Sequence, residues 1–339
     1  MMAKRRALIT GGTGFIGRHL TQAAVSRGWE VYVVTRRPDS EPARRLASQG
    51  ARLLLGDVTA RDAVKAALEV ARPEVFFHNA GWYELGVPRR QHRRMWSVNV
   101  EATELALSLA AEAGVPRTVF TSSTTALGDT GGPIEDEAFE RRSPSLSFYE
   151  RTKAEAHRLA LRHQVAGESV VVACPAQVVG PGDHSAFGVT ARLFVRGRLP
   201  PLAWGPDGAF TFGHVQDVAE AMLSLGERGR AGDVYFLGGH VLTLRELMRV
   251  WQDTLGRRPV WIWLPRGLAL AQGFALGPVL RGLGLPAFIS TETVRSGYVS
   301  FRYSSHKAES ELGARFRPAE QAWRETLLAE KALLTAKPA

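Results

Sequence analysis

The sequence predicts an α/β fold in which a doubly wound parallel sheet carries a smaller C-terminal lobe. Short runs that are apolar throughout alternate with helical stretches along the first half of the chain, which is typical of a parallel sheet covered by helices on both faces. The first run ends in a glycine-rich turn that opens a helix. After Cys174, proline and glycine become frequent and the alternation stops, which indicates long loops and a second, smaller unit.

The expected elements follow from these runs, because each has the length of a strand and each intervening stretch has the length of a helix. Strands are expected at 6–10, 30–35, 51–58, 74–81, 117–123 and 169–174, and helices at 14–27, 60–71, 93–113 and 148–166. Further along, residues 211–222 and 233–239 are expected to return to the sheet, and 259–265 to form a core strand of the lobe.

The composition is that of a globular protein, with 339 residues of which 45% are hydrophobic and 22% charged. The net charge of +10 comes largely from scattered arginine pairs such as Arg36-Arg37, which predicts solvated surface and a few contacts to an anionic ligand rather than a nucleic-acid partner. The single Cys174 cannot form an intrachain disulfide, which favours a reducing, cytoplasmic location. The histidines show no metal-ligand spacing, so no metal is expected.

The most apolar stretch is residues 267–280, between Arg266 and Arg281. It is shorter than the ~20 residues that a membrane-spanning helix needs, so we expect a packed or substrate-covering helix and no stable membrane insertion. Shallow membrane association stays open if the substrate is a lipid.

The glycine-rich turn places Gly11, Gly12, Gly14 and Gly17 between the first strand and the first helix. Glycine permits the tight turn and lets backbone N–H groups approach a pyrophosphate at the helix N-terminus. The context therefore predicts a dinucleotide-binding Rossmann domain. We assign it to residues 1–174 with sheet returns near 205–239, the substrate-binding lobe to 175–204 and 240–330, and a tail to 331–339.

The end of the second strand predicts the type of dinucleotide. An NAD site has Asp or Glu there to hold the ribose 2′-hydroxyl, whereas this chain has Thr35-Arg36-Arg37. Guanidinium groups pair well with a 2′-phosphate. We therefore expect NADP(H), with Arg36 as the chief phosphate contact and Arg37 assisting, while NAD(H) remains an alternative.

One of only six lysines, Lys153, follows Tyr149 by four residues in a predicted helix. Residues four apart share a helix face. A nearby ammonium and an oxidised nicotinamide favour the phenolate and lower the pKa of tyrosine from ~10. In the reductive direction Tyr149 would donate a proton to a carbonyl oxygen. The third member should lie at the end of the fifth strand, where Ser122, Ser123 and Thr124 are candidates.

Together these motifs resemble the extended short-chain dehydrogenase/reductases, the superfamily of NAD-dependent epimerases and dehydratases. The likeness rests on "TGGTGFIG" at 10–17, Asp57-Val58, "HNAG" at 78–81, Tyr149 with Lys153, and "HVQDVA" at 214–219. Segments such as "GRLPP" and "YFLGG" are similar to the dihydroflavonol reductase and 3β-hydroxysteroid dehydrogenase branch. They are especially similar to bacterial members called hopanoid-associated sugar epimerases.

The resemblance implies a site built at the carboxyl ends of the strands. Counting back from Gly128 selects Ser123 as the catalytic hydroxyl with Tyr149 and Lys153, Thr124 being the alternative, and gives Asn99 a structural or water-holding role. The implied cofactor contacts are Gly11, Thr13, Gly14, Phe15, Ile16, Arg36, Arg37, Asp57, Val58, Asn79, Ala80, Gly81, Thr121, Ser122, Tyr149, Lys153, Pro175 and Val178.

The substrate residues are expected on loops that face the nicotinamide, where apolar and aromatic walls suit a ring-containing or lipid-like alcohol or ketone. Sugar-nucleotide epimerases usually carry an arginine where this chain has Phe210, which disfavours a nucleotide-sugar substrate. The effect of Gln216, in place of the family's usual acid, is not predicted. The candidates are Trp82, Tyr83, Thr124, His184, Phe187, Trp204 and Phe210.

Three functions are compatible with these motifs. The first is an NADP(H)-dependent reductase acting on a carbonyl, or alcohol dehydrogenase in reverse. The second is an epimerase or dehydratase that retains its cofactor through turnover. The third, a redox-sensing or RNA-binding protein on the same scaffold, is disfavoured because the Tyr149–Lys153 pair is kept. The family resemblance also implies a homodimer that packs the helices at 93–113 and 148–166.

Overall fold

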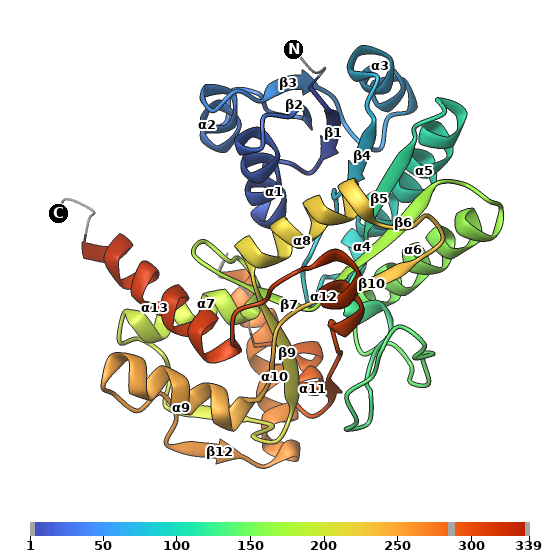
Figure 1. The fold of residues 1–339 in the computed structure, drawn as a ribbon. Helices are drawn as coiled ribbons and strands as arrows, with labels where there is room; N and C mark the ends of the chain where they lie inside the picture. Colours follow the sequence, from blue (N-terminus) through green and yellow to red (C-terminus); the bar gives the residue numbers. More distant parts are fainter. Residues whose placement is uncertain (1–3, 284–288, 336–339) are drawn as a thin grey trace.

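The computed structural model describes residues 4–283 and 289–335, and its centre is a parallel sheet (Figure 1). Seven strands lie in the order β10-β6-β5-β4-β1-β2-β3, and every neighbouring pair is parallel. The order reverses between β1 and β4, which makes that edge the topological switch point. This confirms the predicted doubly wound Rossmann fold. The strands are β1 (Arg6–Thr10), β2 (Glu30–Thr35), β3 (Arg52–Leu55), β4 (Val75–His78), β5 (Arg117–Thr121), β6 (Val170–Pro175) and β10 (Val234–Leu237).

Helices cover both faces of the sheet, because its strands are apolar on both sides. One face packs against α1, α8 and α12, and the other against α3, α5 and α6. These helices are α1 (Phe15–Ser26), α3 (Arg61–Ala71), α5 (Ala102–Glu112), α6 (Phe148–Val165), α8 (Val215–Arg228) and α12 (His306–Leu312). The remaining helices of this half are α2 (Glu41–Ser48) and α4 (Arg89–Trp96).

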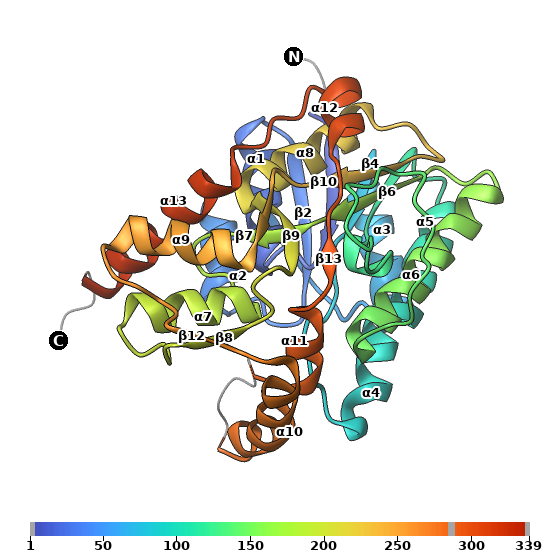
Figure 2. The same ribbon diagram turned by 90° about the horizontal axis from the view of Figure 1, so that it is seen from below.

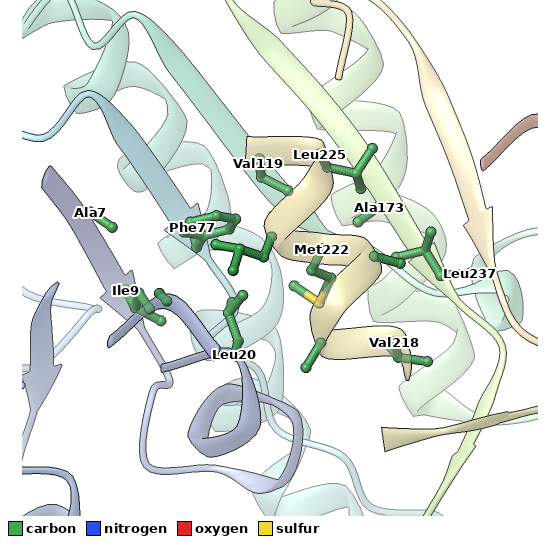
Figure 3. Packing of buried hydrophobic residues seen from close by; sticks show 14 of the residues in the cluster. Ala7, Ile9, Leu20, Phe77, Val119, Ala173, Val218, Met222, Leu225 and Leu237 are labelled. Atoms are coloured by element: carbon green, nitrogen blue, oxygen red, sulfur yellow. The ribbon is translucent and has the colours of Figure 1, made fainter. Parts of the chain in front are cut away.

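Figure 3 shows the first of these packed faces. Phe77 of β4 lies between Leu20 of α1 and Met222 of α8, and all three side chains are fully buried. Burying such side chains contributes roughly 1.5–3 kcal/mol each. The packing therefore holds the strand ends, on which the cleft is built, in a fixed frame.

The predicted helix at 93–113 differs from the structure in one respect. It begins earlier, as α4, and a π-helical turn at Ser97–Glu101 separates α4 from α5. π turns often occur at functional sites. Here the turn carries Asn99, whose side chain is buried.

The second unit has its own sheet, which corrects the prediction for residues 211–222. β9 pairs with β7, β11 and β13 rather than with the central sheet, and only α8, which follows it, packs on the central sheet. β9 is apolar along its whole length because the lobe has a separate aromatic core. Its elements are β7 (Gln177–Val179), α7 (Ala186–Val195), β9 (Ala209–His214), β11 (Val241–Thr243), α9 (Leu244–Leu255), β13 (Ser300–Phe301) and α13 (Ala319–Thr335).

Residues 259–265 do not form a core strand, so that prediction is wrong. β12 (Ile262–Leu264) pairs only with β8 (Leu202–Trp204), and Trp261 and Ile262 are 66% and 54% exposed. The apolar residues lie outside because this two-stranded sheet covers a pocket on one side only. Next to it lie α10 (Arg266–Gly282) and α11 (Thr291–Ser296). The chain stays helical to Thr335, so helix occupies the first five residues of the expected tail. The rest of that tail, 336–339, lies outside the described residues.

Candidate active site

A cleft of about 800 Å³ lies along the carboxyl ends of the central strands. Its walls come from the glycine loop after β1 and from the ends of β2, β3, β4, β5 and β6. All of the cofactor contacts expected from the sequence line it, from Gly11 to Val178. Parallel α/β sheets bind ligands at this edge, and the size suits a dinucleotide.

The glycine loop packs closely against neighbouring backbone only because side chains are absent. Gly11 has φ +66°, and a Cβ there would lie 2.7 Å from the Cα of Ala80. A Cβ on Gly17 would lie 2.0 Å from the Gly11 carbonyl oxygen. Gly14 is the N-cap of α1 and carries no capping side chain. The loop therefore fits a phosphate bound at the helix N-terminus.

The far end of the cleft is basic and bordered by one carboxylate. Arg36 and Arg37 line it, and the Arg36 side chain is 63% exposed, with Nη1 3.8 Å from Oδ2 of Asp57. Hydrogen bonds from Thr59 and the nearby Arg36 oppose burial and lower the pKa of Asp57. Asp57 is therefore ionised at the end of β3, whereas the end of β2 carries arginine.

Tyr149 and Lys153 lie on the first turns of α6, with both side chains in the cleft. Ser147 caps this helix by accepting a hydrogen bond from the Glu150 amide at 3.0 Å. The Lys153 Nζ donates to the Thr121 carbonyl at the end of β5, at 2.9 Å. The Ser123 side chain lines the same cleft as Tyr149 and is close enough to lower the pKa of its phenol. The three candidate catalytic residues are thus brought together at one point.

The predicted lowering of the Tyr149 pKa is wrong for the protein alone. Burial raises the pKa of Tyr149 well above its usual value, and the nearby Ser123 side chain opposes this only in part. The ammonium of Lys153 is held at the Thr121 carbonyl instead. Tyr149 therefore keeps its proton near neutral pH and can donate it.

Lys153 gives the site a pH dependence. Burial lowers its pKa from the usual 10.5 to about 8, so the ammonium is present below that pH and is lost above it. If the ammonium assists reduction, kcat/KM should be constant up to pH 8 and then fall by about tenfold per unit of pH. A pH profile of carbonyl reduction checks this. A flat profile between pH 7 and 10 would contradict the role of Lys153.

Asn99 uses its side chain to hold the backbone, which supports the structural role expected for it. Its Oδ1 accepts from the Trp82 amide at 2.7 Å, and its Nδ2 donates to the Trp82 carbonyl and to Thr152 Oγ1. These bonds join the loop after β4 to α6 directly beside Tyr83 and Lys153. Asn99 therefore fixes the position of residues on both sides of the site.

The three hydroxyls after β5 differ in their partners. Ser122 Oγ lies 2.9 Å from Nδ1 of the buried His157. Ser123 Oγ accepts from the Thr125 amide at 3.1 Å, and its side chain lies close enough to Tyr149 to lower the pKa of that phenol. Thr124 lines a different pocket. This arrangement favours Ser123, the hydroxyl chosen from the sequence.

A second, apolar pocket of about 190 Å³ adjoins the cleft on the side of the smaller lobe. Tyr83 and Tyr149 line both spaces, and their rings pack edge to face at 4.9 Å. Four further residues expected at the substrate line this pocket: Thr124, Phe187, Trp204 and Phe210. His184 and Trp82 line the cofactor cleft instead, and His184 packs edge to face on Phe15 at the glycine loop.

Several residues that line the cleft or the apolar pocket were not predicted from the sequence. Arg94 lines the cleft with its guanidinium over Trp82, 5.5 Å from the ring centroid. Gln177 lines both the cleft and the apolar pocket. Its position in the sequence between the expected contacts Pro175 and Val178 could have predicted this. Further walls of the apolar pocket come from segments that are distant in sequence and carry no motif, among them Leu202, Met248, Trp263, Gln272 and Ile289. Among the described residues, no group of three or more His, Cys, Asp or Glu could hold a metal ion.

A Rossmann sheet that brings a serine, a tyrosine and a lysine to a dinucleotide-sized cleft defines an enzyme of the NAD(P)-dependent dehydrogenase/reductase class. The model of the NAD dependent epimerase/dehydratase family matches residues 7–238. The chain belongs to this family, whose members are the extended short-chain dehydrogenase/reductases.

The chain is similar to curated relatives with several activities. It is 32% identical to the sterol demethylase protein B of Methylococcus capsulatus, over 90% of this chain and 92% of that protein. It is also 32% identical to a 4-hydroxy-2-methyl-3-oxo-4-farnesyl-3,4-dihydroquinoline-1-oxide ketoreductase of Stigmatella aurantiaca, over 74% and 73% of the two chains. The names of these relatives confirm that the chain is an oxidoreductase, but they do not identify its substrate.

Solved structures share the fold over nearly the whole chain. The crystal structure of gox2253 has a TM-score of 0.81 and 28% identity, covering 98% of this chain and 100% of the other. A dTDP-glucose 4,6-dehydratase from Streptomyces venezuelae, solved with NAD, has a TM-score of 0.76 over 96% of each chain. At 21% identity, this second likeness concerns the fold alone.

Proposed function

We propose that the protein is an NADP(H)-dependent reductase that converts a carbonyl into a secondary alcohol on an apolar or ring-containing small molecule. The observation that carries this proposal is the position of Tyr149, whose phenol lines both the dinucleotide cleft and the apolar pocket. A carbonyl in that pocket would meet a protonated phenol at the place where a nicotinamide would end.

The pocket walls favour an apolar substrate over a nucleotide sugar. Phe210 lines the pocket where epimerases of this family usually carry arginine, and it stacks on Phe301 at 5.7 Å. Among the described residues that line this pocket, none is Lys or Arg. A diphosphate would lose its hydration there without a compensating cation. The relatives named for a farnesyl quinoline oxide and for sterol demethylation agree with an apolar substrate.

The chain's residues divide the proposed chemistry among them. When bound, NADPH would supply the hydride. Ser123 would donate a hydrogen bond to the substrate oxygen and stabilise its developing charge. Tyr149 would donate the proton to that oxygen, and Lys153 would stabilise the resulting phenolate. The glycine loop and the basic end of the cleft would fix the position of the dinucleotide along the cleft.

The preference for NADP(H) would depend on Arg36. Arg36→Ala should weaken NADPH binding by about 10–100-fold, because a charge-assisted bond to the 2′-phosphate contributes roughly 1.5–3 kcal/mol. NADH binding should change little, since NADH lacks that phosphate. Titration of both cofactors by fluorescence checks this, with the exposed and remote Arg158→Ala as control. Equal losses for NADH and NADPH would contradict the assignment.

A substrate panel tests the function itself. Incubated with NADPH, the enzyme should oxidise it in the presence of cyclic or lipid-like ketones. No net oxidation is expected with UDP-glucose. Conversion of a nucleotide sugar without net use of added NADPH would instead support the epimerase or dehydratase alternative.

The remaining expectations form part of the same proposal. Residues 1–174 would bind the cofactor, and 175–204 with 240–330 would bind the substrate, in a cytoplasmic enzyme without a nucleic-acid partner. A homodimer through α5 and α6 stays a prediction. Among the described residues, no helix combines the length and apolarity needed to cross a membrane.

A further inference from the structure

One end of the smaller lobe exposes a continuous set of large apolar side chains. Phe274 and Leu268 are 78% and 62% exposed. No charged residue occurs between 267 and 280. Single exposed apolar residues are ordinary on a protein surface, whereas a gathered set marks an interaction site. We call this set the α10 surface: Trp261, Ile262, Leu268, Phe274, Leu276, Val279 and Leu283.

The packing of α10 explains why these side chains face outward. Its buried side is formed by Gly273 and Gly277, which lie against the chain at 289–290. A Cβ on Gly273 would stand 3.0 Å from the Ser290 backbone. The helix thus buries small residues, including Ala269, against the protein and turns Gln272 to the pocket, while its most exposed large side chains are apolar. This is the reverse of an ordinary surface helix.

Arginines border the α10 surface. Arg258 and Arg266 are exposed; Arg266 begins α10, and its guanidinium lies 5.6 Å from the Tyr298 ring centroid. The guanidinium of Arg258 lies 5.6 Å from the Trp261 ring centroid. Aromatic side chains beside arginine, around an apolar face, are typical of helices that lie in the headgroup region of a bilayer.

Further basic charge lies at the same end of the molecule. Figure 2 shows α10 and the start of α4 projecting to one edge, and α4 begins with the exposed Arg89 and Arg90. The loop before α4 is tied to this region because the Gly86 amide donates to Glu292 of α11. The helices expected at a dimer interface, 93–113 and 148–166, include the end of α4, but α5 and most of α6 lie away from α10 (Figure 2).

The apolar pocket lies behind the two segments that carry the α10 surface. Gln272 of α10 and Trp263 of β12 line the pocket, while their neighbours on the same two segments form the surface. One side of each segment therefore contacts the pocket and the other contacts solvent. A membrane resting on this surface would present lipid-dissolved molecules to the pocket wall.

We propose that the α10 surface docks on the headgroup region of an anionic lipid bilayer without spanning it. The arginine border favours negative headgroups, and the seven apolar side chains would enter the boundary between headgroups and acyl chains. This deepens the proposed function, on which its link to the pocket rests, because it makes the substrate a molecule drawn from the lipid phase.

Vesicle co-sedimentation of the full chain tests the docking without cofactor or substrate. The protein should sediment with phosphatidylcholine vesicles that contain phosphatidylglycerol, and less with phosphatidylcholine alone. The double variant Phe274→Glu/Val279→Glu should partition at least about tenfold more weakly, because charge is costly in an interfacial apolar face. Val165→Glu changes a more exposed valine on α6, 91% against 55% for Val279, and should sediment as the wild type.

Several results would overturn the proposal. One is a wild-type protein that stays in the supernatant, and another is a double variant that binds vesicles unchanged. A third is a wild-type dimer that the double variant converts to monomers in size-exclusion chromatography, since a second copy would then cover the surface. Equal unfolding midpoints of the variants exclude misfolding. If vesicles bind but no carbonyl is reduced, the proposed reductase function fails and the docking stands.

Discussion

Tyr149→Phe should lower kcat for carbonyl reduction by about 10²–10⁴-fold, the usual contribution of a general acid. The phenol is buried where the two cavities meet, and burial raises its pKa. It therefore stays protonated and has a proton to donate. Phenylalanine keeps the ring and its packing against Tyr83 but removes that proton, so NADPH binding should change by less than about threefold. Stopped-flow turnover and cofactor titration measure the two quantities.

Tyr83→Phe is the matched control for this change. Tyr83 lines the same junction, and its ring packs on that of Tyr149, yet the proposed mechanism gives its hydroxyl no proton to transfer. We expect it to retain turnover within about tenfold. Near-normal kcat in Tyr149→Phe, or equal losses in the two variants, would remove Tyr149 from the chemistry.

Arg141→Ala should cost about 3–5 kcal/mol of unfolding free energy, the usual effect of removing one partner from a buried ion pair. Arg141 Nη2 lies 2.5 Å from Oε1 of Glu150, whose side chain is only 3% exposed. Burial raises the pKa of Glu150 even with Arg141 present. Arg141 also donates to the Ser143 and Ala126 carbonyls. Its loss would therefore loosen the N-terminus of α6, which carries Tyr149.

Urea unfolding of Arg141→Ala measures this loss against an exposed pair. Arg61→Ala breaks a bridge to Glu112 whose two side chains are 55% and 56% exposed, and such pairs contribute at most about 1 kcal/mol. If both variants unfold at the same urea concentration, the buried pair does not stabilise α6 as described.

Local sequence rules predicted the parts of the site that each depend on one short segment. The glycine loop could be placed because only glycine fits where a Cβ on Gly11 would meet Ala80. Tyr149 and Lys153 share a face because α6 is regular and capped by Ser147. The positions of the strand ends could be predicted from the buried apolar runs. The residues that line the cleft could therefore be predicted, although the shape of the cleft could not.

The rest depended on contacts between segments that are distant in sequence. β9 is as apolar as a strand of the central sheet, and only its pairing with β7 and β11 shows that it belongs to the lobe. Residues 259–265 are apolar because one side lines a pocket, which hydropathy cannot distinguish from burial in a core. The pKa of Tyr149 is raised because tertiary packing buries the phenol, and that burial cannot be predicted from the spacing of Tyr149 and Lys153.

Transfer of deuterium from NADPH that carries deuterium at both positions of nicotinamide C4 tests the central claim most directly. With the most active ketone of the panel, mass spectrometry should find one deuterium on the carbinol carbon of the product for each NADPH oxidised. Product that forms without deuterium, or a nucleotide sugar that is converted with no loss of label from added NADPH, would contradict the account.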